Sequence, residues 1–282
     1  MRIGFIGAGL MGHGMVLNLL KGGHQVQVIA HRNRAPIEDL LARGAREASS
    51  LAEIAQNCDN IFLCLSSSKI VEETITGLKP GLHKNQIIID TSTSEPESTR
   101  RLAGELADLR VGFADAPLTG GPEQAASAEL GVLCGASPEI FARILPLLSC
   151  IATTVRHMEP VGSGHAAKLI SNFLVTGMIT LVAQAFGTAR KANIDWRNLY
   201  EVMLNGSGNS GVLRKMVAPA LDGDFEGYRF SLANASKDIG YFKMLATELG
   251  METSLIDAVE AVFSSAMSKG LGQRNVSHLL AL

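Results

Sequence analysis

The sequence predicts an α/β fold, a doubly wound parallel sheet, followed by an all-helical domain. In the first half, short β-branched runs alternate with segments of helical periodicity, which is typical of right-handed βαβ units. After about residue 160 no strand-like run follows, and apolar residues recur only at helical spacing. We therefore predict two domains, 1–161 and 162–282.

Five runs in the first half have the composition of buried parallel strands. They are 3–7, 25–30, 60–65, 86–92 and 111–117, and two further runs, 130–135 and 151–158, could add two more strands. Helical periodicity is found between them, for example in 10–22, 36–43, 50–57 and 95–109. The last of these opens with Ser94, Glu95 and Pro96, which form a helix start signal.

The second half has helical spacing in 164–192, 196–204, 209–220, 231–250 and 254–268. Its stretch 169–189 is long enough to cross a bilayer. That stretch contains Asn172 and Gln184, and it has neither an aromatic belt nor a basic flanking cluster. We predict a helix buried on all sides within the helical domain, and no membrane span.

Composition and charge exclude other classes of protein. Hydrophobic residues make up 46% of the 282 residues and charged residues 18%, which is too apolar for a disordered chain. The formal net charge is -2, and no basic run could follow a phosphate backbone, so we expect no nucleic-acid partner. The first strand-like run begins so early that no signal peptide fits, and we expect a cytoplasmic protein.

A glycine pattern lies between the first predicted strand and the first predicted helix. Gly7, Gly9 and Gly12 form GxGxxG, the pattern that allows a tight turn, a close approach of backbone to pyrophosphate and close helix packing. The helix N-terminus would present N–H groups and a positive dipole end to the phosphates. We predict a Rossmann-type dinucleotide site formed by Gly7, Ala8, Gly9, Leu10, Met11 and Gly12.

The end of the second predicted strand bears on the choice of cofactor. NAD enzymes usually place a carboxylate there for the ribose 2′-hydroxyl, but this chain has Ala30 and His31, and no acid before Glu38. Arg32 and Arg34 follow, and guanidinium groups suit a 2′-phosphate. We predict that NADP(H) is preferred over NAD(H), with His31 and Arg32 near the phosphate. The alternative, solvated loop arginines, stays open for Arg34 in particular.

Four stretches together resemble one family. They are 4–20, "DAPLTGG" at 115–121, "GSGHAAKLISN" at 162–172, and Lys237–Asp238. On these stretches the chain resembles the β-hydroxyacid dehydrogenases, which include 3-hydroxyisobutyrate dehydrogenase, tartronate semialdehyde reductase and glyoxylate or succinic semialdehyde reductases. The resemblance implies a Rossmann domain joined by a long helix to a helical domain, with the active site in the cleft between them.

The resemblance also implies an activity and its residues. The activity is hydride transfer between a nicotinamide and a small β-hydroxy acid, or the corresponding semialdehyde or keto acid. Lys168 matches the catalytic lysine, and Asn172 matches a substrate-binding asparagine. Thr119, Gly120 and Gly121 match the loop that holds the substrate carboxylate. The positions implied to contact the cofactor are Leu65, Ser66, Thr93 and Lys237.

The chemistry of these residue types agrees with such roles. A lysine can give a proton to a developing alkoxide, and residues four apart share a helix face, so Lys168 and Asn172 can serve one site. Each has a plain structural alternative: a snorkelling lysine and a buried amide capped by backbone. For Asp238, a plain ion pair with a neighbouring helix and a direct role are equally open. His165 could line the cleft, but we expect it on the helix surface. No His, Asp or Glu cluster suggests a metal, and hydride transfer needs none.

Departures from the family pattern leave the substrate open. Pro122 and Glu123 stand where the family usually has small residues, Ser171 replaces an asparagine, and Ser66 often corresponds to proline. Imine reductases share this fold but usually lack the lysine, 6-phosphogluconate dehydrogenase has a longer helical domain, and a non-catalytic dinucleotide sensor is a further alternative. We expect a homodimer or homotetramer, because apolar helical domains usually pair.

Overall fold

The computed structural model describes residues 1–31 and 33–282, so the predicted phosphate ligand Arg32 lies outside the described residues. The chain forms two compact units, Met1–Lys168 and Leu169–Leu282. Their boundary lies inside helix α8 (Ser163–Lys191), whereas the sequence placed the change of domain directly before this helix.

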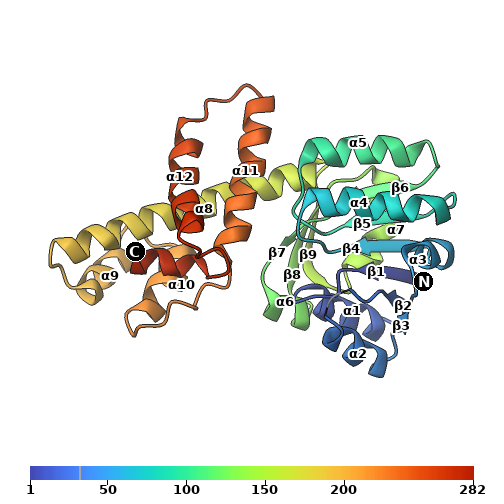
Figure 1. The fold of residues 1–282 in the computed structure, drawn as a ribbon, viewed down its shortest axis with the longest axis horizontal. Coiled ribbons are helices and arrows are strands. Elements are labelled where there is room, and N and C mark those ends of the chain that lie inside the picture. Colours follow the sequence, from blue (N-terminus) through green and yellow to red (C-terminus); the bar gives the residue numbers. More distant parts are fainter. Residues whose placement is uncertain (32) are drawn as a thin grey trace. The chain divides into compact units, whose positions relative to one another are not determined.

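The first unit is built on a six-stranded parallel sheet of order β3-β2-β1-β4-β5-β6. The chain starts in the middle of the sheet at β1, builds outward to β3, returns to β4 beside β1, and then builds outward to β6 (Figure 1). This order confirms the doubly wound prediction and places a switch point between β1 and β4. The strands are β1 (Arg2–Ile6), β2 (Gln25–Val28), β3 (Arg46–Glu47), β4 (Asn60–Leu63), β5 (Ile87–Asp90) and β6 (Gly112–Asp115).

Helices cover both faces of this sheet, because successive strand side chains point to opposite sides. On one face, Met15 and Leu40 pack with Ile87 and Ile144; on the other, Ile54 and Ile75 pack with Ile88. The helices of the first face are α1 (Gly12–Lys21), α2 (Ala35–Ala42) and α7 (Pro138–Leu148). Those of the second face are α3 (Leu51–Asn57), α4 (Ser68–Leu78) with the short η1 (Lys79–Gly81), and α5 (Pro96–Ala107).

The last strands of this unit form a separate small sheet of order β7-β8-β9. Runs 130–135 and 151–158 were expected as two further strands, and they form β8 (Leu130–Cys134) and β9 (Ala152–His157), which pair with each other outside the main sheet. The chain reaches β8 from β7 (Leu118–Thr119) through the short helix α6 (Pro122–Ser127), so β8 pairs with β7 in antiparallel fashion. A bridge between Asp115 and Gly135 joins β6 to this segment.

The second unit is helical, as predicted. Its residues are all described, and none of them lies in a named strand. The remaining elements are α9 (Trp196–Leu204), α10 (Gly211–Ala220), α11 (Leu232–Glu248), α12 (Ser254–Ser268) and the 3₁₀ segment η2 (Val276–Ala281). Ile179 and Phe186 of α8 pack with Val217, Ile239 and Phe263 in its core.

Helix α8 differs from its prediction in one respect. Length and composition alone would let it cross a membrane, and the sequence predicted a helix buried on all sides. The structure buries one stripe that contains Leu169, Ile179 and Phe186, while Leu174 is 65% and Leu181 70% exposed. The helices of the unit pack against only one side of α8, and its other side keeps an apolar surface.

Candidate active site

In the glycine loop, packing requires glycine at two positions but not at the third. A Cβ on Gly7 would lie 2.2 Å from the Cys64 carbonyl oxygen, and Gly7 has φ +100°. A Cβ on Gly12 would lie 2.2 Å from the Gly7 carbonyl oxygen and 2.7 Å from the Phe5 ring. A Cβ on Gly9 would meet nothing within 4 Å. Packing gives no reason for glycine there, so the bare backbone fits the close approach of a pyrophosphate.

Other predicted cofactor residues lie at the same edge of the sheet. Leu65 and Ser66 follow β4, which pairs with β1, and Thr93 follows β5, which pairs with β4, so both loops leave the carboxyl end of the sheet. The two loops are joined, because the Leu65 N–H donates to the Ser92 hydroxyl at 2.9 Å. Ser66 is exposed, while Leu65 and Thr93 are half-buried. The first unit thus brings these residues together with the glycine loop at the switch point, where α/β sheets bind ligands.

After β2, one of the two arginines considered for the 2′-phosphate is already paired with carboxylates of the protein. His31 is exposed, and Arg34 makes a two-pronged ion pair with Glu47, at 3.0 Å for both Nη1–Oε1 and Nη2–Oε2. Arg34 also lies 3.6 Å from Glu38. Hydrogen bonding to Glu47 raises the pKa of Arg34, and the same contact lowers the pKa of Glu47. The fork of Arg34 is therefore occupied within the protein.

The predicted carboxylate loop lies between β7 and α6. Gly120 has φ +110°, a conformation that favours glycine. The Gly121 N–H donates to Oε1 of Gln124 at 2.9 Å, so it is already committed to this side chain. Thr119 is half-buried, and its hydroxyl has no hydrogen bond to any other described residue. The Thr119 hydroxyl and the Gly120 N–H are thus better placed than the Gly121 N–H to receive a carboxylate.

The first turn of α8 is capped from the sheet. The Asp115 carboxylate, at the end of β6, accepts hydrogen bonds from the N–H of Gly162 at 2.6 Å and of His165 at 2.7 Å. A carboxylate at a helix N-terminus satisfies unpaired N–H groups and matches the helix dipole. Burial raises the pKa of Asp115, and His165 with the two N–H groups opposes part of that rise. Lys168 lies in the next turn, half-buried.

His165 is fully buried, so its expected place on the helix surface is wrong. Its ring nitrogens lie 2.7 Å from the Thr99 hydroxyl and 3.1 Å from the Ser92 carbonyl oxygen. These partners are more than sixty residues away in the sequence. Helical periodicity therefore could not reveal them.

The second unit holds the other predicted residues. Asn172 Nδ2 donates to Asp238 Oδ2 at 2.6 Å, and Lys237 Nζ lies 3.1 Å from Asp238 Oδ1. Asp238 is 4% exposed, and no hydrogen bond reaches its Oδ1 from the described residues. Lys237 also lies 5.1 Å above the Tyr241 ring. The sequence left the role of Asp238 open, and its contact with Asn172 makes it part of this polar group.

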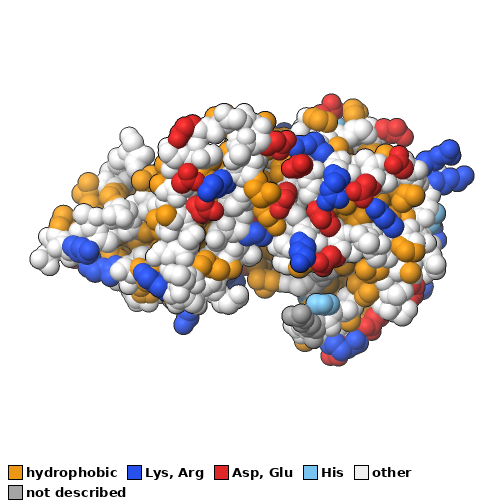
Figure 2. Space-filling model, turned by 45° about the horizontal axis from the view of Figure 1, so that its top comes forward, with side chains coloured by type: hydrophobic (Ala, Val, Ile, Leu, Met, Phe, Trp, Pro, Cys, Tyr) orange, Lys and Arg blue, Asp and Glu red, His pale blue; other side chains and the backbone are white. Residues whose placement is uncertain are grey.

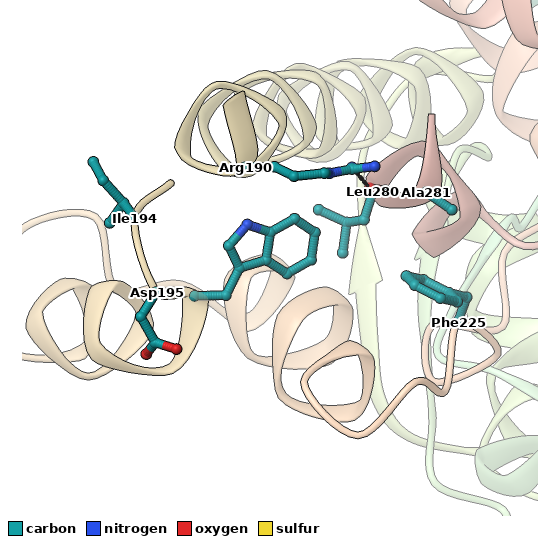
Figure 3. Close-up of a pocket in the computed structure, with 7 residues that line it drawn as sticks. Arg190, Ile194, Asp195, Phe225, Leu280 and Ala281 are labelled. Carbon is teal, nitrogen blue, oxygen red and sulfur yellow. Dashed lines mark hydrogen bonds between the residues drawn. The ribbon is translucent and has the colours of Figure 1, made fainter. Parts of the chain in front are cut away.

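A different pocket of the second unit contains no predicted site residue. It has a volume of about 540 Å³ and is lined by Arg190, Ile194, Asp195, Trp196, Phe225, Leu280 and Ala281 (Figure 3). Arg190 donates to the Leu280 carbonyl and lies 5.3 Å from the Trp196 ring. These contacts attach η2 to α8, which explains the pocket as packing of the C-terminal segment.

Two electrostatic features complete the description. In the part of the chain that the structure describes, no three or more His, Cys, Asp or Glu side chains gather in a way that could hold a metal ion. Acidic and basic side chains are interspersed on the face of the molecule seen in Figure 2. That pattern matches the small net charge of -2.

Comparison with known proteins identifies the family. Residues 2–159 match the family described as the NAD binding domain of 6-phosphogluconate dehydrogenase. Residues 162–282 match that described as NAD-binding of NADP-dependent 3-hydroxyisobutyrate dehydrogenase. The chain belongs to the β-hydroxyacid dehydrogenase family. It is an NAD(P)-dependent oxidoreductase, and helix α8 is part of its second matched domain.

Relatives of this dehydrogenase match over nearly its whole length. A 2-(hydroxymethyl)glutarate dehydrogenase of Eubacterium barkeri is 31% identical over 99% of this chain and 93% of its own. A 2-hydroxy-3-oxopropionate reductase of Escherichia coli is 27% identical over 99% and 96%. The crystal structure of a 3-hydroxyisobutyrate dehydrogenase from Salmonella typhimurium is 26% identical, covers 100% and 99%, and has a TM-score of 0.88.

Proposed function

We propose that this dehydrogenase interconverts a small β-hydroxy acid and the corresponding semialdehyde or keto acid, with NADP(H) as the preferred cofactor. The observation that carries the proposal is the pair Lys168 and Asn172, one turn apart on α8, with Asn172 hydrogen-bonded to the buried Asp238. A proton donor and an oriented amide on one helix face are what reduction of a carbonyl requires. The named relatives that act on small hydroxy or oxo acids add support.

In the direction of reduction, a nicotinamide held by the glycine loop would supply the hydride for the carbonyl carbon. The Lys168 ammonium gives one proton to the oxygen, and in the reverse direction the neutral amine takes the proton from the hydroxyl. The Thr119 hydroxyl and the Gly120 N–H bind the substrate carboxylate. Asp238 fixes the Asn172 amide, whose carbonyl oxygen then accepts a hydrogen bond from the hydroxyl of the β-hydroxy acid. Lys237 holds the second oxygen of Asp238.

The function is tested with a panel of small aldehyde acids in the presence of NADPH. We expect loss of nicotinamide absorbance with at least one aldehyde that carries a carboxylate, and much slower turnover of its uncharged analogue. Binding of NADPH without turnover of any compound would favour a non-catalytic sensor. Reduction of cyclic imines alone would favour an imine reductase.

The cofactor preference has its own test. Two features support NADP(H): the absence of a carboxylate directly after β2, and the occupation of Glu38 by Arg34. Arg32→Ala should weaken NADPH binding by about tenfold or more, since a charged hydrogen bond contributes about 1.5–3 kcal/mol. NADH binding should change little, as measured by nicotinamide fluorescence. Equal weakening of both cofactors would contradict the assignment; Lys69→Ala, which removes an exposed cation on α4, is the control.

We also propose that the protein is a homo-oligomer paired through α8. The support is the apolar surface of this helix, where Ile170, Leu174 and Leu181 are each more than half exposed. Surfaces of this kind usually mark protein–protein contacts. Light scattering at micromolar concentration should give at least twice the 29.9 kDa of one chain, and a monomer would contradict the proposal.

A further inference from the structure

Buried polar groups gather where α8 begins in the first unit. His165, Asp90 and Asp115 are each 0% exposed. Nε2 of His165 lies 3.8 Å from Asp90 Oδ2, and Nδ1 lies 3.9 Å from Asp115 Oδ2. Buried groups of this kind are costly unless they are paired. The cluster lies one turn before Lys168, and the reaction proposed above gives it no role.

The His165 ring makes two hydrogen bonds to different elements. Its Nε2 lies 3.1 Å from the Ser92 carbonyl oxygen, which can only accept, so Nε2 carries a proton. Its Nδ1 lies 2.7 Å from the Thr99 hydroxyl, which also lies 3.0 Å from the Glu95 carbonyl oxygen. The ring therefore ties α8 to the loop after β5 and to α5.

Two anchors then act on one turn of α8. Asp115 holds the backbone through the N–H groups of Gly162 and His165, which sets where the helix starts. The His165 ring reaches sideways to Ser92 and Thr99, which sets the rotation of the helix about its axis. Residues three apart on a helix are neighbours, so fixing His165 fixes the direction in which Lys168 leaves α8.

Ser92 links the same ring to the cofactor loops. Its carbonyl accepts from His165, and its hydroxyl accepts from the N–H of Leu65. The next residue is Thr93, which follows β5 at the edge of the sheet. Ser92 and Thr93 therefore connect the start of α8 to the loops that follow β4 and β5.

We propose that His165 is a positioning residue for Lys168: by joining Ser92 to Thr99 it sets the rotation of the first turn of α8 and so aims the lysine. The inference rests on the proposed function, in which Lys168 moves the proton. Proton transfer requires its donor within hydrogen-bond reach of the oxygen, and a misplacement of about 1 Å can cost about 100-fold in rate.

The experiment compares three variants with an aldehyde acid and NADPH. His165→Leu should lower kcat by about 100-fold, with little change in NADPH binding or in the KM for the aldehyde acid. His165→Gln should recover most of kcat, because its amide NH₂ can still donate to the Ser92 carbonyl oxygen. Gln86→Leu is the matched control, since Gln86 is 1% exposed and directly precedes β5, at the amino end of the sheet and away from Ser92. It should destabilise the protein and keep kcat.

The outcomes separate this inference from the proposed function. A kcat in His165→Leu that is no lower than in Gln86→Leu, or a glutamine variant as slow as the leucine variant, overturns the inference. If His165→Leu does not fold, Thr99→Val decides, since it keeps the shape and removes one partner hydroxyl; an unchanged kcat there overturns it. Full activity of Lys168→Ala would overturn the proposed function itself. The double variant His165→Leu with Lys168→Ala should be no slower than Lys168→Ala alone, because His165 acts through Lys168.

Discussion

The two ends of the parallel sheet are both closed by buried polar side chains, yet they differ in what those side chains touch. At the amino end, Gln86 donates to the carbonyls of Ala55 and Cys58 and accepts from the N–H of His83. At the carboxyl end, the Asp115 carboxylate accepts from the N–H groups of Gly162 and His165 at the start of α8, and the His165 ring bonds to Ser92 and Thr99. The polar side chains at both ends are therefore buried and hydrogen-bonded, but only those at the carboxyl end lie next to predicted site residues.

The comparison teaches that a buried polar group is no sign of function by itself. Gln86 completes backbone hydrogen bonds that the fold left open, which is its whole effect. The cluster at the carboxyl end also makes hydrogen bonds to a loop and a helix that contain predicted site residues. Location at the carboxyl edge of an α/β sheet, rather than burial, distinguishes the two.

The largest expected effect comes from breaking the carboxyl end at Asp115. Asp115→Asn keeps one oxygen but turns an NH₂ group toward a backbone N–H, which leaves that donor unpaired. We expect a loss of about 2–4 kcal/mol in the free energy of unfolding, since a buried charged hydrogen bond is lost, together with a large loss of kcat. Urea denaturation and steady-state kinetics measure the two. Retention of full kcat would show that the cap of α8 does not matter to the reaction.

The amino end should respond in stability alone. Gln86→Leu removes one acceptor and two donated hydrogen bonds and leaves backbone groups of α3 and of the turn before β5 unpaired. The expected loss is about 2–3 kcal/mol in urea denaturation, with kcat per folded molecule unchanged. A fall in kcat as large as that of the Asp115 variant would remove the distinction between the two ends.

Sequence patterns predicted the sheet and the glycine loop well because both depend on local signals. Strand runs such as 60–65 are largely apolar, and Gly12 is required by contacts with Phe5 and Gly7 in the connection from β1 to α1. The separate small sheet was not predictable, because pairing of β8 with β9 instead of β6 depends on how the chain turns after β7. The exposed side of α8 was missed for a similar reason, since an all-round apolar helix gives no indication of which face the other helices cover.

The candidate site was predictable where it rests on motifs and unpredictable where it rests on distant partners. Spacing alone places Lys168 and Asn172 on one face of α8. The contacts of His165 with Ser92 and Thr99 and of Asn172 with Asp238 join residues more than sixty positions apart. No periodicity links such pairs, so the sequence assigned His165 to the surface and left Asp238 open.

The smallest expected effect concerns the exposed ion pair at the amino end. Arg2 bonds to Asp59 at 2.5 and 3.2 Å and holds the pKa of Asp59 below its usual range. Both side chains are about half exposed, so Arg2→Ala should lower the free energy of unfolding only slightly at pH 7. A depressed carboxyl pKa stabilises the fold above the unfolded pKa of about 4. The difference between the two proteins in urea should therefore vanish as the pH falls and Asp59 is protonated. A difference that persists in acid would contradict this cause.

The most direct test of the account is kcat of Lys168→Ala with NADPH and the best aldehyde acid. Lys191→Ala is the matched control, since it removes a lysine from the last turn of the same helix. We expect Lys168→Ala to lose about 10²–10⁴-fold in kcat, the usual contribution of general acid–base catalysis, while NADPH still binds and the control keeps its activity. Near-normal turnover of Lys168→Ala would contradict the assignment of Lys168 as the residue that moves the proton.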